Sequence, residues 1–345
     1  MRPTRAPVFA LPEPGSILGY RKDGRPIYHI AGAASTDIID SWIPIEWDSE
    51  VIQRIQRESA IEQLGYRVPM GSATKRILRS AGLTVTAGTT YTDDTSTNDY
   101  ITLTARRLIA KFTVDEDDLS DAATVVDTIR IKGMDWAISY ADSFDNACLG
   151  VSAAENGSTV PFTSAYKSLR TTNSATGYTA DDNYVTWDDD LIAIPSTPLG
   201  TSLYERLSTA FKKVETGQFW SQADQFVIAA PGWRDALRLC TDNQGRPIFQ
   251  PASGSTPDSL FGAPITWSRG AKVSATMLGA PGGNDLLLFG NKSYLKKGER
   301  SQPESLVDQA RAQDNTDDTA VKFRVRRAFQ LAHEKAFSIV ERITD

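Results

Sequence analysis

Residues Ser120–Gly150 carry the longest helical pattern in the sequence, and this pattern constrains the fold more than any other feature. Ser120 can cap the start of the helix and Gly150 can end it. At about 1.5 Å per residue the helix would be roughly 45 Å long. We therefore expect a long helix around which the rest of the chain is organised. One stripe runs along it at three- and four-residue steps, formed by Val126, Ile129, Gly133, Ala137, Tyr140, Phe144 and Cys148.

The composition limits the class of protein. The chain has 345 residues, enough for two or three domains, and its 40% hydrophobic residues can form a real core. It contains no apolar run long enough to span a membrane and no export signal, so we expect a soluble protein. The net charge of −6 argues against a dedicated duplex-DNA binder, which needs a basic face. Cys148 and Cys240 are predicted to be buried thiols without a disulfide.

The first 65 residues are expected to form an arm followed by a short helix. Residues 1–47 are interrupted by Pro and Gly and cannot form a core of their own. Such an arm lies on a neighbouring surface or is a disordered tail. Residues Asp48–Leu64 have helical spacing, with Asp48 as a possible cap and Gly65 as the stop.

Residues Tyr66–Val114 predict a long two-stranded hairpin. Apolar and polar residues alternate in Leu83–Ala87 and again in Ile101–Val114, and the phase slips at Arg106-Arg107, where a bulge would absorb the extra residue. Arms of about fifteen residues would reach roughly 50 Å. Because an isolated hairpin is marginal in water, we expect it to rest on another surface, either a neighbouring subunit or its own domain.

The remaining chain predicts a loop, a compact α/β block and closing strands. Residues Val151–Asn183 are rich in turn formers and are expected to be loop-like. After a polar connection, Ser301–Thr319, the residues Val321–Leu331 alternate cleanly, and we expect these strands to pack beside the long helix. The α/β block is predicted to contain helices at Ser202–Gly217, capped by Ser202 and Glu205, and at Trp233–Cys240, and strands at Gln225–Ala230, Gly262–Trp267 and Asn284–Asn291.

The sequence shows no catalytic, metal or cofactor motif. Zinc-protease, CxxC, GxSxG and Walker-type patterns are all absent. Of the two histidines, His29 and His333, the second is expected to have a structural role. Acidic pairs such as Asp93-Asp94 and Asp181-Asp182 fit no EF-hand spacing and are expected to be solvated turns. We therefore predict a protein that is not an enzyme and that uses no cofactor or metal.

A few exposed residue types are candidates for contacts between subunits. Basic residues cluster in the last alternating segment and at the end of the hairpin, and they would bind either phosphates or acidic residues of a neighbour, of which we favour the second. The polar hairpin tip, Gly88–Asp99, holds one aromatic residue. The candidates are Tyr91, Arg106, Arg107, Lys322, Arg324 and Arg326.

Several local sequences resemble one known family. Residues Ala141–Gly150, ADSFDNACLG, are similar to the end of its long helix, and Leu239–Phe249 end in its GRPIF pattern. Leu260–Ile265 and Leu288–Asn291 resemble two of its later segments, and Arg326–Phe337 looks like its closing strand pair. In this order, these segments resemble the major capsid proteins of tailed bacteriophages over about residues 43–343.

The resemblance implies an α+β protein with the HK97-like capsid fold. Its parts would be an N-arm with a short helix (1–65), an extended E-loop hairpin (66–114), a P-domain spine helix and loop (115–186), an α/β A-domain (187–300) and P-domain return strands (301–345). In such shells A-domains meet at the centres of pentamers and hexamers, while N-arms and E-loops lie across neighbours. Contact with a neighbouring subunit would explain how a long hairpin is stable without support from its own domain.

The implied function is self-assembly into hexamers and pentamers of an icosahedral shell, which encloses the double-stranded DNA of a tailed phage without sequence-specific binding. The resemblance also implies a separate scaffolding protein, a portal and decoration proteins as partners, and assembly in the host bacterial cytoplasm into a virion. Some relatives form crosslinks through an E-loop lysine. Because Gly88–Asp99 contains no lysine, we expect none here. The alternatives are an encapsulin-type compartment shell and a cytoplasmic enzyme with its site in the α/β domain.

Overall fold

The computed structural model divides the chain into two compact units, Met1–Val51 and Ile52–Asp345. It describes residues 17–20, 26–28, 58–80, 87, 93, 99–115, 128–188, 199–240, 246, 249–250, 258–308 and 318–343. In the first unit, β1 (Ile17–Tyr20) pairs antiparallel with β2 (Pro26–Tyr28). The arm predicted for residues 1–47 therefore contains a small hairpin, which its Pro and Gly content did not indicate.

The long helix is α4, which spans Thr128–Leu149 in the second unit. Its predicted start at Ser120 lies outside the described residues. Its predicted end is confirmed, because Gly150 donates its N–H to the Asn146 carbonyl and the helix stops there. A Cβ atom at Gly150 would lie 1.9 Å from the Lys272 carbonyl oxygen, so only glycine permits this close approach.

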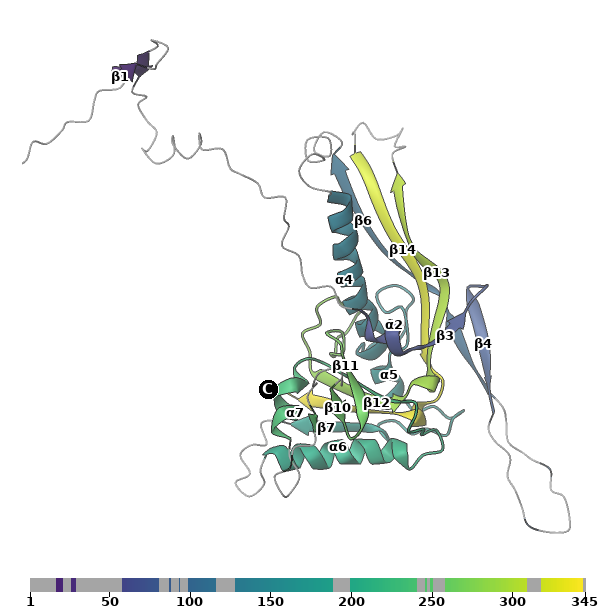
Figure 1. The fold of residues 1–345 in the computed structure, drawn as a ribbon. Helices are drawn as coiled ribbons and strands as arrows, with labels where there is room; N and C mark the ends of the chain where they lie inside the picture. Colours follow the sequence, from purple (N-terminus) through teal and green to yellow (C-terminus); the bar gives the residue numbers. More distant parts are fainter. Residues whose placement is uncertain are drawn as a thin grey trace, which may run out of the picture. The chain divides into compact units, whose positions relative to one another are not determined.

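A four-stranded sheet lies along α4 (Figure 1), and its strands follow the order β3-β13-β14-β6. These strands are β3 (Tyr66–Pro69), β13 (Leu295–Asp308), β14 (Asp318–Leu331) and β6 (Arg106–Asp115). The alternation predicted for Val321–Leu331 is confirmed, and β14 packs against α4 as expected. The polar connection predicted to begin at Ser301 is wrong, because β13 continues to Asp308 while paired with β14.

The predicted long hairpin is wrong in its pairing. The hairpin consists of β4 (Thr74–Arg79) and β5 (Asp99–Thr104), which pair antiparallel over six residues. At Ala105 the chain leaves this ribbon, and β6 then pairs with β14 instead. The phase change near Arg106-Arg107 is thus a change of sheet and not a bulge. Most of the predicted arm Leu83–Ala87 lies outside the described residues.

The short helix is also shorter than predicted. Helix α2 covers Ala60–Leu64 and begins after Ser59, whose side chain accepts the N–H of Glu62 as an N-cap. Ser59 has an extended backbone, so a continuous helix over Asp48–Leu64 is wrong. The cap predicted at Asp48 lies outside the described residues. The stop at Gly65 is confirmed.

The second sheet has seven strands in the order β7-β15-β12-β8-β11-β10-β9. Its strands are β7 (Tyr184–Asp188), β8 (Gln225–Ala229), β9 (Phe249–Gln250), β10 (Ser259–Leu260), β11 (Ala263–Trp267), β12 (Asp285–Asn291) and β15 (Phe337–Ile343). The sheet is mixed, because β7 runs parallel to β15 and β11 parallel to β8, while β12 is antiparallel to both of its neighbours. The strands predicted in the α/β block are confirmed.

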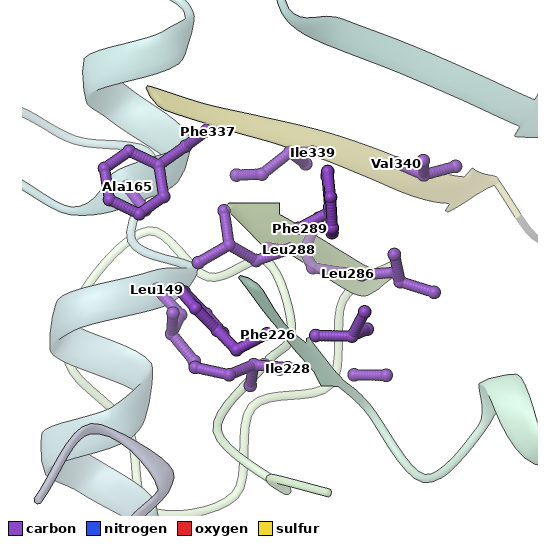
Figure 2. Close-up of a cluster of buried hydrophobic side chains, with 14 of the residues drawn as sticks. Leu149, Ala165, Phe226, Ile228, Leu286, Leu288, Phe289, Phe337, Ile339 and Val340 are labelled. Atoms are coloured by element: carbon purple, nitrogen blue, oxygen red, sulfur yellow. The ribbon is translucent and has the colours of Figure 1, made fainter. Parts of the chain in front are cut away.

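Helices pack against the seven-stranded sheet and bury its hydrophobic core. Helix α6 (Leu199–Glu215) contacts β7, β12 and β15, and α7 (Trp233–Leu239) packs against α6. Helix α6 begins before Ser202, so that serine is not its cap. Figure 2 shows side chains of β8, β12 and β15 meeting Leu149 at the end of α4 and Ala165 in α5 (Ala165–Leu169). Helix α5 lies in a segment predicted as loop.

The sheet pairings also bear on the expected division of the chain. β15 lies in the seven-stranded sheet between β7 and β12, although residues 301–345 were expected beside α4. β13 runs through the boundary expected at residues 300 and 301. The assignment of residue ranges to an N-arm, E-loop, P-domain and A-domain stays a prediction. Short 3-10 turns, η2 (Lys292–Tyr294) and η3 (Glu334–Ala336), precede β13 and β15.

Two further expectations concern the thiols and membrane spans. Cys148 and Cys240 are both buried and no disulfide joins them, as predicted. Burial raises the pKa of the Cys240 thiol to about 12, so it stays protonated at neutral pH. Among the helices in the described part of the chain, none is long and apolar enough to cross a membrane.

Candidate assembly surface

The face of the four-stranded sheet that points away from α4 carries most of the predicted contact residues. Successive strand residues point to opposite faces. On β14 the odd-numbered Val321, Phe323 and Val325 are buried, and Phe323 stacks on Trp136 of α4 with ring centroids 5.3 Å apart. The alternate positions of β14 and β6 therefore face outward. We call the outward cations Arg107, Lys111, Lys322, Arg324 and Arg326 the basic strip.

The strand register places like charges of the basic strip directly opposite each other. Arg107 pairs in register with Arg326, and Lys111 pairs with Lys322. Like charges facing each other across two strands are destabilising. Glu304 of β13 offsets part of this charge, because its carboxylate lies 2.7 Å from the Arg324 guanidinium. The sequence alone identified the basic cluster on β14. That Arg107 and Lys111 of β6 lie beside this cluster became evident only from the pairing register of β6 with β14.

Arg106 does not belong to this surface. It lies opposite Arg327 on the other face of the sheet, and its guanidinium lies 2.8 Å from the Glu155 carboxylate. Gly157 has a φ of 77° and would place a Cβ atom 2.8 Å from this guanidinium. Arg106 thus fixes the loop after α4 within one subunit. Tyr91, the remaining contact candidate, lies outside the described residues.

The β4–β5 hairpin covers the same face of β14 farther along the strand. Ala328 packs there with Leu103 of β5 and with Val68 and Met70 at β3. The outer side of the hairpin exposes Leu78, whose surface is 83% accessible. A single exposed apolar side chain is common on protein surfaces, so Leu78 becomes a candidate contact residue only together with its neighbours. Sequence reasoning missed Leu78 because β4 has no clean alternation.

A buried ionic network joins α2 to the four-stranded sheet. The Glu62 carboxylate accepts hydrogen bonds from Lys297 Nζ and Arg327 Nε, both at 2.6 Å, and from the Tyr140 hydroxyl at 2.7 Å. Lys297 also lies 3.1 Å from Glu299. The Lys297 and Arg327 side chains are only 6% and 5% exposed. No sequence motif indicated this network, because its members are distant in the chain.

The network holds Glu62 in its ionised form. Burial raises the pKa of this carboxyl, but hydrogen bonds from Lys297, Arg327 and Tyr140 outweigh that effect and keep the pKa below its ordinary value. The negative charge of Glu62 in turn raises the pKa of the Tyr140 hydroxyl, in addition to the larger effect of burial. Glu62 is therefore a fixed anion between two buried cations, which is a structural arrangement and not an acid–base site.

Asp145 of α4 binds the N-terminus of helix α2. Its carboxylate accepts the N–H groups of Ala60 at 2.9 Å and Ile61 at 3.1 Å, and the hydroxyls of Ser59 and Ser268. An anion at a helix N-terminus is favoured by the unpaired N–H groups there. Burial raises the pKa of Asp145 and the four donors oppose this. Asp145 thus connects α2, α4 and the segment that follows β11.

The neighbouring Asn146 connects α4 to residues 270–278. Its amide nitrogen donates to the carbonyls of Gly270 and Lys272, at 3.1 and 2.9 Å, and its amide oxygen accepts from Ser274 Oγ and Leu278 N. All four hydrogen-bonding positions of this buried amide are filled. Asp145 and Asn146, the DN pair within ADSFDNACLG, therefore join the end of the long helix to the segment that connects β11 and β12.

The next residues of interest are those that could bind a metal ion, and His333. The described residues contain no group of three or more His, Cys, Asp or Glu side chains that could hold a metal ion. His333 stacks on Phe219 with ring centroids 3.9 Å apart, and its Nδ1 accepts the Lys335 N–H. Burial lowers the pKa of His333 to about 4, so the ring is neutral at pH 7. Its contacts are those of a packed side chain that caps the 3-10 turn η3.

The fold is shared with capsid chains of known structure. A chain of Mycobacterium phage Bobi superposes with a TM-score of 0.63 at 17% identity, covering 91% of this chain and 100% of that chain. The capsid of a native GTA particle gives a TM-score of 0.62 at 15% identity, with coverage of 91% and 100%. Microbacterium phage Oxtober96 gives 0.59 at 17% identity, with the same coverage. No curated protein sequence matches significantly.

The long helix against an extended sheet, joined to a second mixed sheet, is the HK97-like fold that these chains share. The sequence model of the phage capsid family matches residues 41–341. The chain belongs to the phage capsid family and is a structural protein of a virion shell. The resemblance seen in the sequence is thereby confirmed.

Proposed function

We propose that this chain is a major capsid protein that assembles with copies of itself into hexamers and pentamers of an icosahedral shell, which encloses the double-stranded DNA genome of a tailed phage. The observation that carries the proposal is the family match over residues 41–341. We also propose a separate scaffolding protein, a portal and decoration proteins as partners, and assembly in the cytoplasm of the host bacterium.

Surface features of the described subunit support self-association. The β4–β5 hairpin exposes Leu78, and the neighbouring sheet face exposes Ile109, 69% accessible, among the cations of the basic strip. A soluble subunit that stayed monomeric would leave these apolar groups in water. Contact with further copies would bury them.

The negative net charge of the chain supports a capsid shell that encloses DNA without binding it tightly. At a net charge of −6, the protein as a whole repels phosphate. Sequence-specific duplex binding needs a basic face that enters a groove, together with base contacts. An acidic shell would leave packaged DNA free to leave the capsid.

The rival within the same fold is an encapsulin-type shell that loads a protein cargo. A cytoplasmic enzyme with its site in the α/β domain is a weaker rival, because no set of acid, base and nucleophile converges among the described residues. Electron microscopy of the purified protein tests the proposal directly. We expect closed shells, and particles from infected cells should contain nuclease-protected double-stranded DNA. A protein cargo without DNA would favour the encapsulin, and a stable monomer by light scattering would overturn shell assembly.

A further inference from the structure

A cavity of about 760 Å³ lies beside the end of the β4–β5 ribbon. Four stretches of the described chain line it: the end of this ribbon, the loop that follows α5, the C-terminal end of α6 with the residues after it, and the turn η3. These stretches are distant in sequence, so only the folded subunit forms the cavity. A cavity of this size can hold a small molecule or a side chain of another chain.

The wall of the cavity carries more positive than negative charge. Among the described lining residues, three are cationic, Arg79, Lys213 and Lys335, and two are anionic, Asp99 and Asp182. Arg79 and Asp99 form an ion pair at the last register pair of the β4–β5 ribbon. Within the lining, this leaves the two lysine cations against the exposed carboxylate of Asp182.

Arg79 and Lys213 offer hydrogen-bond donors in this wall. The Arg79 side chain is 15% exposed and donates from Nη1 to the Ala332 carbonyl at 3.1 Å, but its buried Nε has no hydrogen-bond partner in the described part of the chain. Lys213 Nζ donates to the Asp182 carbonyl, and an ammonium group has two further donor positions. Because an unsatisfied buried donor is costly, an acceptor group from outside the subunit would gain binding energy from these donors.

His333 adds another donor to the cavity. Its Nδ1 accepts the Lys335 N–H at 3.2 Å, so in the neutral ring the proton lies on Nε2. The ring stacks on Phe219 with centroids 3.9 Å apart, which fixes its orientation. Burial lowers the pKa of His333, the positive charges of Arg79 and Lys335 lower it further, and Glu334 opposes them. An anion bound beside the ring would raise this pKa, because a nearby negative charge favours the protonated ring.

We propose that this cavity binds one oxyanion group, a carboxylate or a phosphate, with Arg79, Lys213 and Lys335 as its cationic donors. The inference goes beyond the proposed function, because the unassembled subunit already contains this lining. A polyanion such as duplex DNA fits less well, since the carboxylates of Asp99 and Asp182 lie in the same wall and repel further negative charge. The oxyanion comes either from a free ion or from an acidic side chain of another chain in the shell.

Hydrogen exchange at the imidazole C2 position tests binding in the full-length subunit. This exchange proceeds through the protonated ring, and mass spectrometry of peptides measures His333 separately from His29. Inorganic phosphate is the probe, and sodium chloride at the same ionic strength controls for general screening. At about pH 5, a rise of the His333 pKa from about 4 to about 5 gives about fivefold faster exchange. We expect this increase to saturate with phosphate and to be absent in chloride.

Two substitutions in the lining test which residues bind the phosphate. Lys335→Gln and Lys213→Gln should each raise the phosphate concentration that gives half of the full effect by about tenfold, because each removes a charge-assisted donor. Each variant is compared with its own exchange rate in chloride, since the loss of a cation by itself changes the pKa of His333. Circular dichroism checks that each variant is folded.

Lys212→Gln is the matched control. Lys212 is exposed, directly precedes Lys213 on α6 and lies outside the cavity lining. Its substitution makes the same change in net charge, and the phosphate concentration for half of the effect should stay at the wild-type value.

Exchange in assembled shells distinguishes the two sources of the oxyanion. In chloride without phosphate, faster exchange of His333 in shells than in subunits, abolished by Lys335→Gln, would assign the site to an acidic side chain of a neighbouring chain. Equal exchange in shells and subunits, with phosphate still effective, would assign it to a free ion.

Two results would overturn the proposal. One is an equal response of His333 to phosphate and to chloride, which would mean that salt screening alone acts on the ring. The other is an unchanged half-effect concentration in both Lys335→Gln and Lys213→Gln, which would place the phosphate outside this cavity. Failure of the wild-type protein to form shells would overturn the proposed function and leave the phosphate result in the subunit standing.

Discussion

Glu62 and Arg327 lie 265 residues apart in sequence, and the Glu62 carboxylate accepts a 2.6 Å hydrogen bond from the Arg327 guanidinium inside the protein. Lys297 binds the second carboxylate oxygen. These contacts join a five-residue helix to the two central strands of the four-stranded sheet. Such a short helix is not stable alone, so its position depends on the network.

We therefore expect Glu62→Gln to destabilise the subunit by about 3 kcal/mol, because two buried cations lose their shared anion. Urea unfolding of unassembled subunits measures this loss. The matched control is Glu58→Gln, since Glu58 is exposed just before the same helix. Equal stability of the two variants would show that the network contributes nothing.

Asp145→Ala should cost about 3 kcal/mol or more, because four buried donors lose their acceptor. Asp145→Asn retains one acceptor oxygen of the same shape and should cost less than the alanine variant. Thermal unfolding of the two variants gives the comparison. If both variants unfold at the wild-type temperature, Asp145 does not hold α2 in place.

Phe144→Asp should prevent folding of the subunit. The Phe144 ring is fully buried and contacts the rings of Tyr140 and Phe162, so a carboxylate at this position would be buried among aromatic side chains. By contrast, Tyr91→Ala at the predicted hairpin tip should leave the subunit folded and weaken only the shell. Circular dichroism and shell yield distinguish the two effects. An unfolded Tyr91→Ala subunit would contradict the assignment of that residue to assembly.

The stability of the subunit should depend on pH through His333. Its pKa is about 4 in the folded protein and near 6.5 when unfolded, so the unfolded state binds the extra proton between these values. The contribution of the neutral ring is therefore lost as the pH falls from about 6.5 to 4. In the pH range from about 4 to 6.5, His333→Gln should reduce the slope of the unfolding free energy plotted against pH. An unchanged slope would show that His333 titrates normally.

Capsid subunits of this chain should separate as monomers in boiling SDS, because the segment Gly88–Asp99 offers no lysine for a covalent link. Gel electrophoresis of purified particles is the measurement. A ladder of multimers that survives reducing agent would show a crosslink through other residues.

Local patterns predicted the local elements well. The buried runs of β8 and β12 and the amphipathic face of α6 identified strands and helix within a few residues, because burial on one or both faces leaves a direct periodic signal. The end of α4 was predicted correctly because glycine, here Gly150, commonly ends helices. The family resemblance supplied the fold, which periodicity alone could not.

Pairing across the sequence could not be predicted in the same way. The alternation of Ile101–Val114 slips in phase at Arg106-Arg107, which we interpreted as a bulge, yet the two halves join different sheets at Ala105. Partner choice depends on β14, more than 200 residues later. For the same reason, the sequence did not indicate that Arg106 faces Glu155 while Arg107 faces outward, or that Glu62 meets two cations.

The position of β15 has a consequence for how the subunit is made. Phe337–Ile343 forms a strand inside the seven-stranded sheet, flanked on both sides by strands that are synthesised earlier. A nascent chain that has not yet reached Ile343 leaves the edges of β7 and β12 unpaired. Translation must therefore pass this point before the sheet can close, and a prematurely terminated chain cannot supply a shell with a completed subunit.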